Sequence, residues 1–351
     1  MLYPLTLNFY LSQAMQDITR REDPSLHVLR AGGGKSRSRL IAACEYLMNL
    51  LRTPSSIVAA FLVAFLAFSP MTTWAQSARD YLNTPVNQAR FFLDFIDSSG
   101  ETAAESDLPL PDIETVLRLV STSILWSFPL GDRYGGVALT GNYATVKVKT
   151  PHGSLETSGF GDPSITIHAN IFGAPALTMD QYPHAVPQTY LSFHLTVNAP
   201  LGSYDRNSSV NVGANRWAFK PLLNLCITPD KGVSWIDLYA GARFFTNNDA
   251  FRGNHQLSQN ALATFTAHYS HNIGERMYAS IGLHYDTGGE SYVNGIPQHD
   301  EASGFRPTVS VSGAVGKFRV TLLYENTAST PRAAPTNGLL SLKLSGPLYP
   351  F

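Results

Sequence analysis

The chain has 351 residues, of which 15% are charged and 44% hydrophobic, and its formal net charge is −1. About a quarter of residues are charged in an ordinary globular protein, and the near-neutral balance excludes the basic surface expected of a nucleic-acid-binding protein. The only cysteines are Cys44 and Cys226. Removal of an N-terminal leader would leave Cys226 alone and exclude an intrachain disulfide.

A short apolar run near the N-terminus has the anatomy of a secretory signal peptide. The run covers 57–68, follows Arg52 and is closed by Thr73-Trp74-Ala75, a small-x-small pattern that predicts cleavage after Ala75. Twelve residues are too few for a spanning helix, which needs about 20; a retained signal anchor is the alternative. Met48 begins a leader of ordinary length. We therefore expect three parts: 1–47, a misannotated N-terminal extension; 48–75, the signal peptide; and 76–351, the mature domain.

The mature chain is dominated by alternating sequence. In 189–198, Leu191, Phe193 and Leu195 occupy one set of positions and the hydrogen-bonding residues Ser192 and His194 the other. A strand places successive side chains on opposite faces, so one face meets an apolar medium and the other a wet one. Twelve segments have this character: 90–97, 114–128, 137–149, 164–172, 189–198, 212–228, 233–245, 259–271, 276–286, 306–315, 318–326 and 339–351.

The lengths of the connections alternate along the chain. Long connections at 246–258, 287–305 and 327–338 alternate with short ones at 229–232, 272–275 and 316–317. Outer-membrane barrels have long external loops, short periplasmic turns and an even number of strands. A soluble sandwich is the alternative, and the connection 173–187 is longer than the rule expects. We predict an all-β fold: a transmembrane antiparallel up-and-down β-barrel of about twelve strands, with both termini in the periplasm of a Gram-negative bacterium.

Several segments resemble the outer-membrane transporter family labelled meta-pathway of phenol degradation. They are 159–163 (Gly-Phe-Gly-Asp-Pro), 198–205 (Asn-Ala-Pro-Leu-Gly-Ser-Tyr-Asp), 212–217 with Phe219 and Pro221, and 282–286 (Gly-Leu-His-Tyr-Asp), and the resemblance covers about 80–351. It implies a barrel that passes small, mostly apolar compounds, with no catalytic residue to transfer. The terminal Phe351 resembles the signal read by the barrel-assembly machinery, although Ser345 and Pro347 depart from its usual pattern.

The polar face supplies the candidate site residues. The candidates for lining the lumen are Tyr190, His194, Asp237, Tyr239, Arg243, His268, Tyr278, His284 and Lys343. The histidines lie on different strands with no ligand spacing, so we expect no metal and no cofactor. No P-loop is present, so transport would run downhill.

Three functions follow from these residues. The first is passive uptake of small apolar or aromatic compounds, in contact with outer-membrane lipids and without nucleic acid. The second is a structural outer-membrane barrel, because twelve strands lie between filled and water-holding barrels. The third is an outer-membrane esterase or phospholipase using His268 and Ser270, a pair two residues apart on one face. We expect the first, and therefore no enzyme.

Overall fold

The computed structural model describes residues 76–102, 113–150, 153–208, 210–326 and 336–350. The chain divides into two compact units, Met1–Ala67 and Phe68–Phe351, and all described residues belong to the second. The predicted extension 1–47, the predicted signal peptide 48–75 and Phe351 lie outside the described residues.

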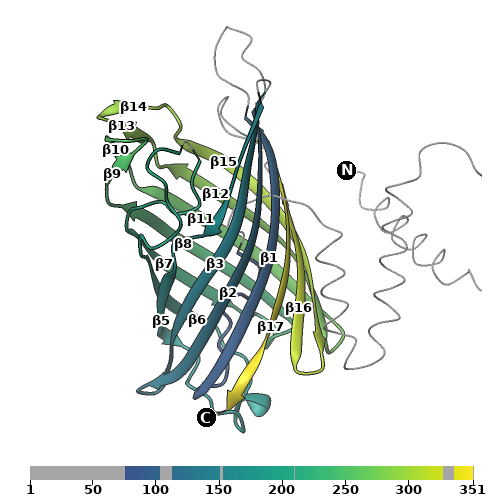
Figure 1. Ribbon diagram of the computed structural model, residues 1–351. Helices are drawn as coiled ribbons and strands as arrows, with labels where there is room; N and C mark the ends of the chain where they lie inside the picture. The colour runs from purple at the N-terminus through teal and green to yellow at the C-terminus, as the bar shows by residue number, and fades with distance from the viewer. Residues whose placement is uncertain (1–75, 103–112, 151–152, 209, 327–335, 351) are drawn as a thin grey trace, which may run out of the picture. The chain divides into compact units, whose positions relative to one another are not determined.

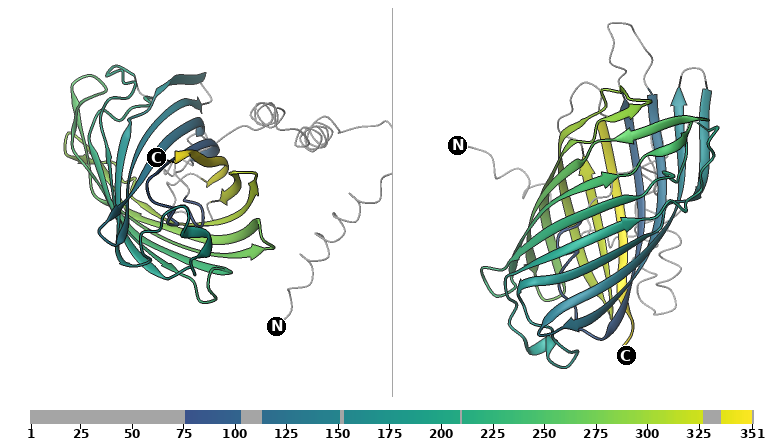
Figure 2. Two further views of the ribbon diagram at one scale, coloured as in Figure 1. Left: turned by 90° about the horizontal axis from the view of Figure 1, so that it is seen from below. Right: turned by 90° about the vertical axis from the view of Figure 1, so that its left-hand side faces the viewer.

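Twelve antiparallel strands close into a barrel (Figures 1 and 2). The ring runs β1-β2-β3-β5-β6-β7-β8-β11-β12-β15-β16-β17 and closes by pairing of β17 with β1. Its strands are β1 (Gln88–Thr102), β2 (Ile113–Leu130), β3 (Arg133–Thr150), β5 (Ser164–Gly173), β6 (Tyr190–Asn198), β7 (Ala218–Ile227), β8 (Ser234–Phe245), β11 (Leu262–Ile273), β12 (Met277–Gly288), β15 (Ala302–Val315), β16 (Phe318–Asn326) and β17 (Thr336–Pro350). The predicted fold class and strand number are confirmed.

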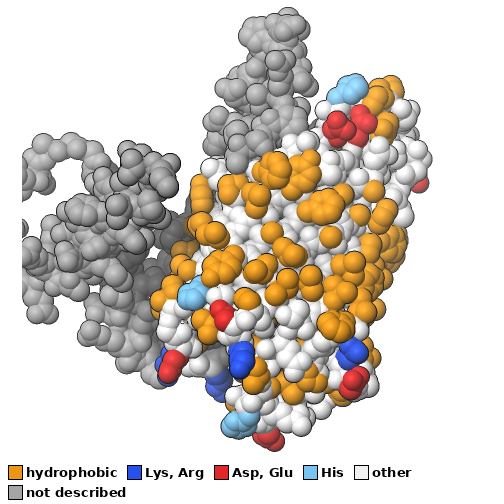
Figure 3. All heavy atoms as spheres, turned by 180° about the vertical axis from the view of Figure 1, so that it is seen from behind, with side chains coloured by type: hydrophobic (Ala, Val, Ile, Leu, Met, Phe, Trp, Pro, Cys, Tyr) orange, Lys and Arg blue, Asp and Glu red, His pale blue; other side chains and the backbone are white. Residues whose placement is uncertain are grey.

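The two faces of the wall differ as alternation predicts. On β12, Tyr278, Ser280 and His284 are buried, whereas Ile281 and Leu283 are exposed. Apolar side chains cover the middle of the outer surface shown in Figure 3, and charged ones gather in its lower part and at its upper tip. The exposed apolar set includes Ile124, Trp126, Leu139, Ile167, Phe193, Leu223, Leu238, Phe265, Ile281, Val309 and Leu322. A band of this kind matches the hydrocarbon core of a membrane.

The connections also sort by end. The end that holds the C-terminal end of β17 in Figure 1 carries the turns 131–132, 228–233, 274–276 and 316–317. The connection 174–189, with its 3-10 turn η1 (Tyr182–His184), lies at this end and is the long exception. At the other end, β9 (Asn248–Phe251), β10 (His255–Gln259), β13 (Ser291–Val293) and β14 (Ile296–Pro297) form a small separate sheet. The sequence analysis did not predict these four strands.

The predicted strand boundaries differ from the observed ones by several residues in places, and the largest difference is at the start of β7. The segment 212–228 was expected to be strand throughout, but β7 begins only at Ala218. Before it, Gly213 donates its backbone N–H to the Ser203 carbonyl (2.9 Å), and Ala214 donates to Asp162 (2.8 Å). These backbone groups are therefore bonded within a docked loop and are not available to a strand ladder.

Candidate functional site

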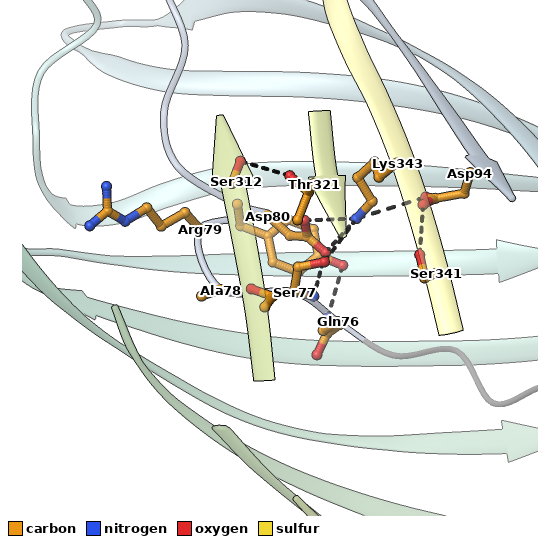
Figure 4. Close-up of polar contacts among 12 residues, drawn as sticks. Gln76, Ser77, Ala78, Arg79, Asp80, Asp94, Ser312, Thr321, Ser341 and Lys343 are labelled. Atoms are coloured by element: carbon orange, nitrogen blue, oxygen red, sulfur yellow. Dashed lines mark hydrogen bonds and ion pairs between the residues drawn. The ribbon is translucent and has the colours of Figure 1, made fainter. Parts of the chain in front are cut away.

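Residues 76–87 fold into the barrel lumen ahead of β1, and we call them the plug segment. Asp80 marks its centre: Lys343 of β17 donates to both carboxylate oxygens, at 2.8 and 2.9 Å (Figure 4). Asp94 of β1 lies 3.8 Å from the same ammonium group, and Ser341 donates to Asp94 at 3.2 Å. An ammonium shielded from water is costly unless it is paired. Lys343 therefore ties the plug to the barrel wall.

Arg79 makes the second attachment. Its backbone N–H donates to Asp237 (3.0 Å), and its guanidinium donates to Ser270 (2.7 Å) and Asn272 (2.7 Å). The same guanidinium lies 4.2 Å from the ring centre of Tyr278, within cation–π range. Arg79 has a φ of 66°, an uncommon conformation for a residue with a side chain. This single residue thus bridges β8, β11 and β12.

Aromatic rings surround Tyr81, the next plug residue. Its ring centre lies 4.1 Å from that of His194 and 5.8 Å from that of Tyr239. Tyr190 donates its hydroxyl to the Tyr81 carbonyl (2.8 Å), and Tyr278 donates to the Ala78 carbonyl (3.1 Å). Burial, followed by the charge of Asp80, raises the pKa of the Tyr81 phenol. The ring therefore stays uncharged, and the plug presents an aromatic surface to the polar wall.

A second polar cluster lies on β12, β15 and β16. Arg306 forms an ion pair with Glu325 (2.8 Å) and another with Asp286. Glu325 also lies 3.5 Å from the ring nitrogen of His284. The three strands that carry these side chains are neighbours in the ring. Acidic and basic side chains therefore brace the wall across β12, β15 and β16.

All nine candidate lumen residues lie on the inward face, but they are not free to meet a solute. Tyr190, Asp237, Tyr239, Tyr278 and Lys343 contact the plug segment or abut it. His194 also packs on Tyr81, and His284 belongs to the second cluster. His268 lies between Tyr239 and His284, and Arg243 shares the inward face of β8 with Asp237 and Tyr239. The inward face is therefore covered by the plug along one side.

The pair considered for esterase chemistry is not joined. Ser270 accepts its hydrogen bond from Arg79 (2.7 Å), and neither ring nitrogen of His268 has a hydrogen-bond partner among the described residues. The ring instead lies over Gly282, where a Cβ would approach it to 2.0 Å. Gly282 is thus needed for the position of His268. His194 and Ser192 do share a hydrogen bond (2.8 Å) of the kind that activates a nucleophile. The sequence did not indicate a role for this pair.

One strand of the barrel wall is interrupted opposite the middle of β3, and we call this interruption the break. β4 (Gly153–Phe160) pairs with Tyr143–Thr150 of β3, and β5 pairs lower down with Gly135–Thr140. Between them, 161–163 (Gly-Asp-Pro) form no regular strand, although Gly161 donates its N–H to the Asn142 carbonyl of β3 (3.0 Å) and Pro163, which has no N–H of its own, accepts from Ala199 (2.9 Å). β6 reaches only as far as Ser164, which pairs with Asn198. Among the described strands β4 therefore has one hydrogen-bonded neighbour, β3, and its outer edge pairs with no other strand.

The loop 199–217 docks at this break. Asp162 accepts backbone hydrogen bonds from Gly202 (2.9 Å) and Ala214 (2.8 Å). Ser203 donates its N–H to the Phe160 carbonyl (2.6 Å). The approach is close, because a Cβ on Gly202 would come within 2.8 Å of the Asp162 backbone. The loop covers the foot of β4, and Phe160 and Leu201 beside it are strongly exposed.

Two further features are absent from the part of the chain that the structure describes. No helix there is long and apolar enough to cross a membrane. No group of three or more His, Cys, Asp or Glu side chains there is arranged to hold a metal ion. Cys226 is free and buried, and donates to Asp237 (2.8 Å).

Comparison with known proteins identifies the family. Residues 97–344 match the family model "Putative MetA-pathway of phenol degradation". The chain belongs to this family. A search of curated proteins finds no significant match.

Solved structures share the fold. The COG4313 outer membrane channel from Pseudomonas putida F1 is similar with a TM-score of 0.66 and 19% identity, over 78% of this chain and 100% of that one. The β domain of the Bordetella autotransporter BrkA aligns with a TM-score of 0.46 and 11% identity, over 74% and 100%. A FadL homologue from Pseudomonas aeruginosa aligns with a TM-score of 0.40 and 7% identity, over 74% and 90%. Only the first likeness is close enough to compare folds, and it supports the outer-membrane type of barrel.

Proposed function

We propose that this protein carries small apolar or aromatic compounds passively across the outer membrane. The observation that carries the proposal is the outer edge of β4, which pairs with no strand above the break at 161–163. A wall of paired strands shields its lumen from the bilayer, whereas this edge of β4 is bonded at its foot, Phe160, to the docked loop and has no neighbouring strand. The similar COG4313 protein from Pseudomonas putida F1 is called an outer membrane channel, and the family description refers to phenol degradation; both agree with this function.

The lumen itself favours the same class of solute. The plug segment is bonded to β8, β11, β12 and β17, which opposes a wide water-filled route. An apolar solute dissolved near the barrel meets Leu155, Phe160 and Leu201, each more than half exposed, beside the break. Inside, the rings of Tyr190, Tyr239 and Tyr278 lie against the plug segment, so a solute stacks on them when the plug moves aside. Aromatic stacking then contributes about 0.5–1.5 kcal/mol beyond area burial. Binding of that strength holds a solute weakly enough for release.

The proposal includes a setting for the barrel. The apolar outer band contacts outer-membrane lipids, and Phe351 serves recognition by the barrel-assembly machinery. Transport is downhill, since the sequence has no P-loop. A structural barrel is the second candidate, and the bonds that hold the plug to the wall favour it.

Uptake of labelled phenol by whole cells tests the proposal. Deletion of the gene should slow initial uptake, and the wild-type gene should restore it. Tyr190→Ala and Tyr239→Ala should restore it only in part, whereas Tyr324→Ala, which removes an exposed ring from the outer face, should restore it fully. The amount of folded protein is measured in each strain. Equal uptake with and without the gene would contradict the transport function and favour the structural barrel.

A further inference from the structure

A cavity of about 120 Å³ lies where the plug segment leaves the barrel. Its walls come from plug residues Leu82–Thr84, from the long connection 174–189 and from the first residues of β6 and β8. Leu82, Leu177, Val186 and Trp235 make much of this wall apolar. Val186 is more than half exposed, so the cavity opens on one side. The connection 174–189, which is longer than the other turns at this end of the barrel, therefore forms part of the cavity wall.

The polar groups around the cavity are satisfied, with one exception. Tyr190 donates to the Tyr81 carbonyl (2.8 Å), and Trp235 donates to the Gly232 carbonyl (3.1 Å). Thr84 shares a hydrogen bond with the Tyr134 hydroxyl (2.9 Å). The side-chain amide of Asn83 is different: its nitrogen and its oxygen are both buried, and neither has a hydrogen-bond partner among the described residues.

An unpaired buried amide indicates that a hydrogen-bond partner is missing. Leaving such a group unsatisfied costs more than a hydrogen bond normally gains, so native structures rarely do it. The Asn83 backbone is fixed, because its carbonyl accepts a hydrogen bond from Tyr182 (2.8 Å). The amide can both donate and accept. Both amide atoms are shielded from water, so the Asn83 side chain has to turn toward the cavity to meet a ligand. A ligand hydroxyl or carbonyl there would then satisfy the amide while the rest of the ligand stays on apolar wall.

The volume of the cavity limits the size of the ligand. An engineered apolar cavity of about 150 Å³ accommodates benzene, so a cavity of about 120 Å³ open on one side suits a single ring. The Trp235 and Tyr190 rings supply aromatic surface, since their polar ends are already bonded. Fused rings or long acyl chains would have to extend out of the open side.

We propose that this cavity binds single-ring aromatic compounds that carry one hydroxyl or carbonyl group, with Asn83 as the residue that selects the polar group. The site lies two residues along the plug from Tyr81, which packs on lumen residues His194 and Tyr239. On the transport route it would be the last apolar binding site that a solute meets before its release at the end of the barrel with the short turns. Binding stands by itself; only its place in transport rests on the function proposed above.

Fluorescence quenching of Trp235 tests binding directly. The full protein is placed in lipid nanodiscs with Trp74, Trp126 and Trp217 changed to Phe, so that Trp235 alone reports. 4-Nitrophenol should quench it saturably, and unlabelled phenol should compete. Asn83→Leu should weaken 4-nitrophenol binding about threefold to tenfold, the range of one hydrogen bond. Nitrobenzene, which lacks the hydroxyl, should be unaffected by this change.

Two further variants make the test decisive. Ala185→Phe, which fills the cavity, should abolish saturable quenching by both probes. Asn247→Leu, an exposed asparagine at the other end of the barrel, should change nothing. Quenching that rises linearly with the probe, or that survives Ala185→Phe, would show partition into lipid and overturn the site. Equal loss of both probes in Asn83→Leu would overturn the role of Asn83.

Uptake by cells separates the site from the transport function. If Ala185→Phe loses binding and slows phenol uptake, the site lies on the route. If binding is lost and uptake is unchanged, the cavity does not lie on the transport route, while the uptake proposal stands. If wild-type protein binds saturably but the gene gives no uptake, the uptake function is wrong and the binding site stands.

Discussion

Lys343 is the residue on which the closed state of the lumen depends most. It is the cation between Asp80 of the plug and Asp94 of the wall. The alternation of β17 predicts that Lys343 faces inward, but its partner is 263 positions away. No spacing within one strand encodes such a pairing. The sequence therefore predicts which side chains face the lumen, whereas the plug contacts that occupy them appear only in the structure.

Replacing Lys343 should loosen the plug. Lys343→Met keeps the length of the side chain and leaves Asp80 and Asp94 without their cation. Loss of one partner of a buried ion pair costs on the order of 3 kcal/mol, enough to populate states with the plug displaced. Single-channel recordings in planar bilayers should show longer and more frequent openings than wild type. Lys317→Met, on the exposed turn before β16, is the control; identical traces from Lys343→Met would argue against a latch.

At the scale of elements, the plug segment and β4 were not predicted from the sequence, and neither were the four strands of the small separate sheet. Residues 76–87 show no alternation and are too short to give a periodic signal. The motif 159–163 was noticed as a family resemblance, but its role as a break in the wall depends on where β6 ends. The twelve ring strands were predictable because each repeats one pattern over a membrane thickness. Breaks and plugs depend instead on contacts between distant segments.

Removing the plug tests its role as an element. Residues 76–87 replaced by a Gly/Ser segment of equal length should leave the ring intact, because the ring strands pair with one another and with β4, and the strand pairings do not involve the plug segment. A flexible segment cannot replace the bonds of Arg79 and Asp80. We expect severalfold larger conductance and faster liposome swelling in neutral sugars. Unchanged conductance, in protein shown to be folded by heat-modifiable migration, would mean that the wall itself closes the lumen.

For the whole molecule, the orientation in the membrane follows from the two unlike ends. Single cysteines at His299, in the β14–β15 connection, and at Glu275, in the β11–β12 turn, sample the ends separately. Both positions are exposed, and the native Cys226 is buried. A membrane-impermeant maleimide added to intact cells should label the first and spare the second. Labelling of the second site alone would invert the proposed topology.

The central claim is that the barrel passes apolar solutes and not polar ones of the same size. The most direct measurement compares initial uptake of labelled phenol and labelled glycerol, which have nearly the same mass, in cells that lack general porins. Expression of the gene should raise phenol uptake and leave glycerol uptake unchanged, because the plugged lumen offers glycerol no wet route. An increase in glycerol uptake equal to or larger than that for phenol would contradict the account and indicate an ordinary aqueous pore.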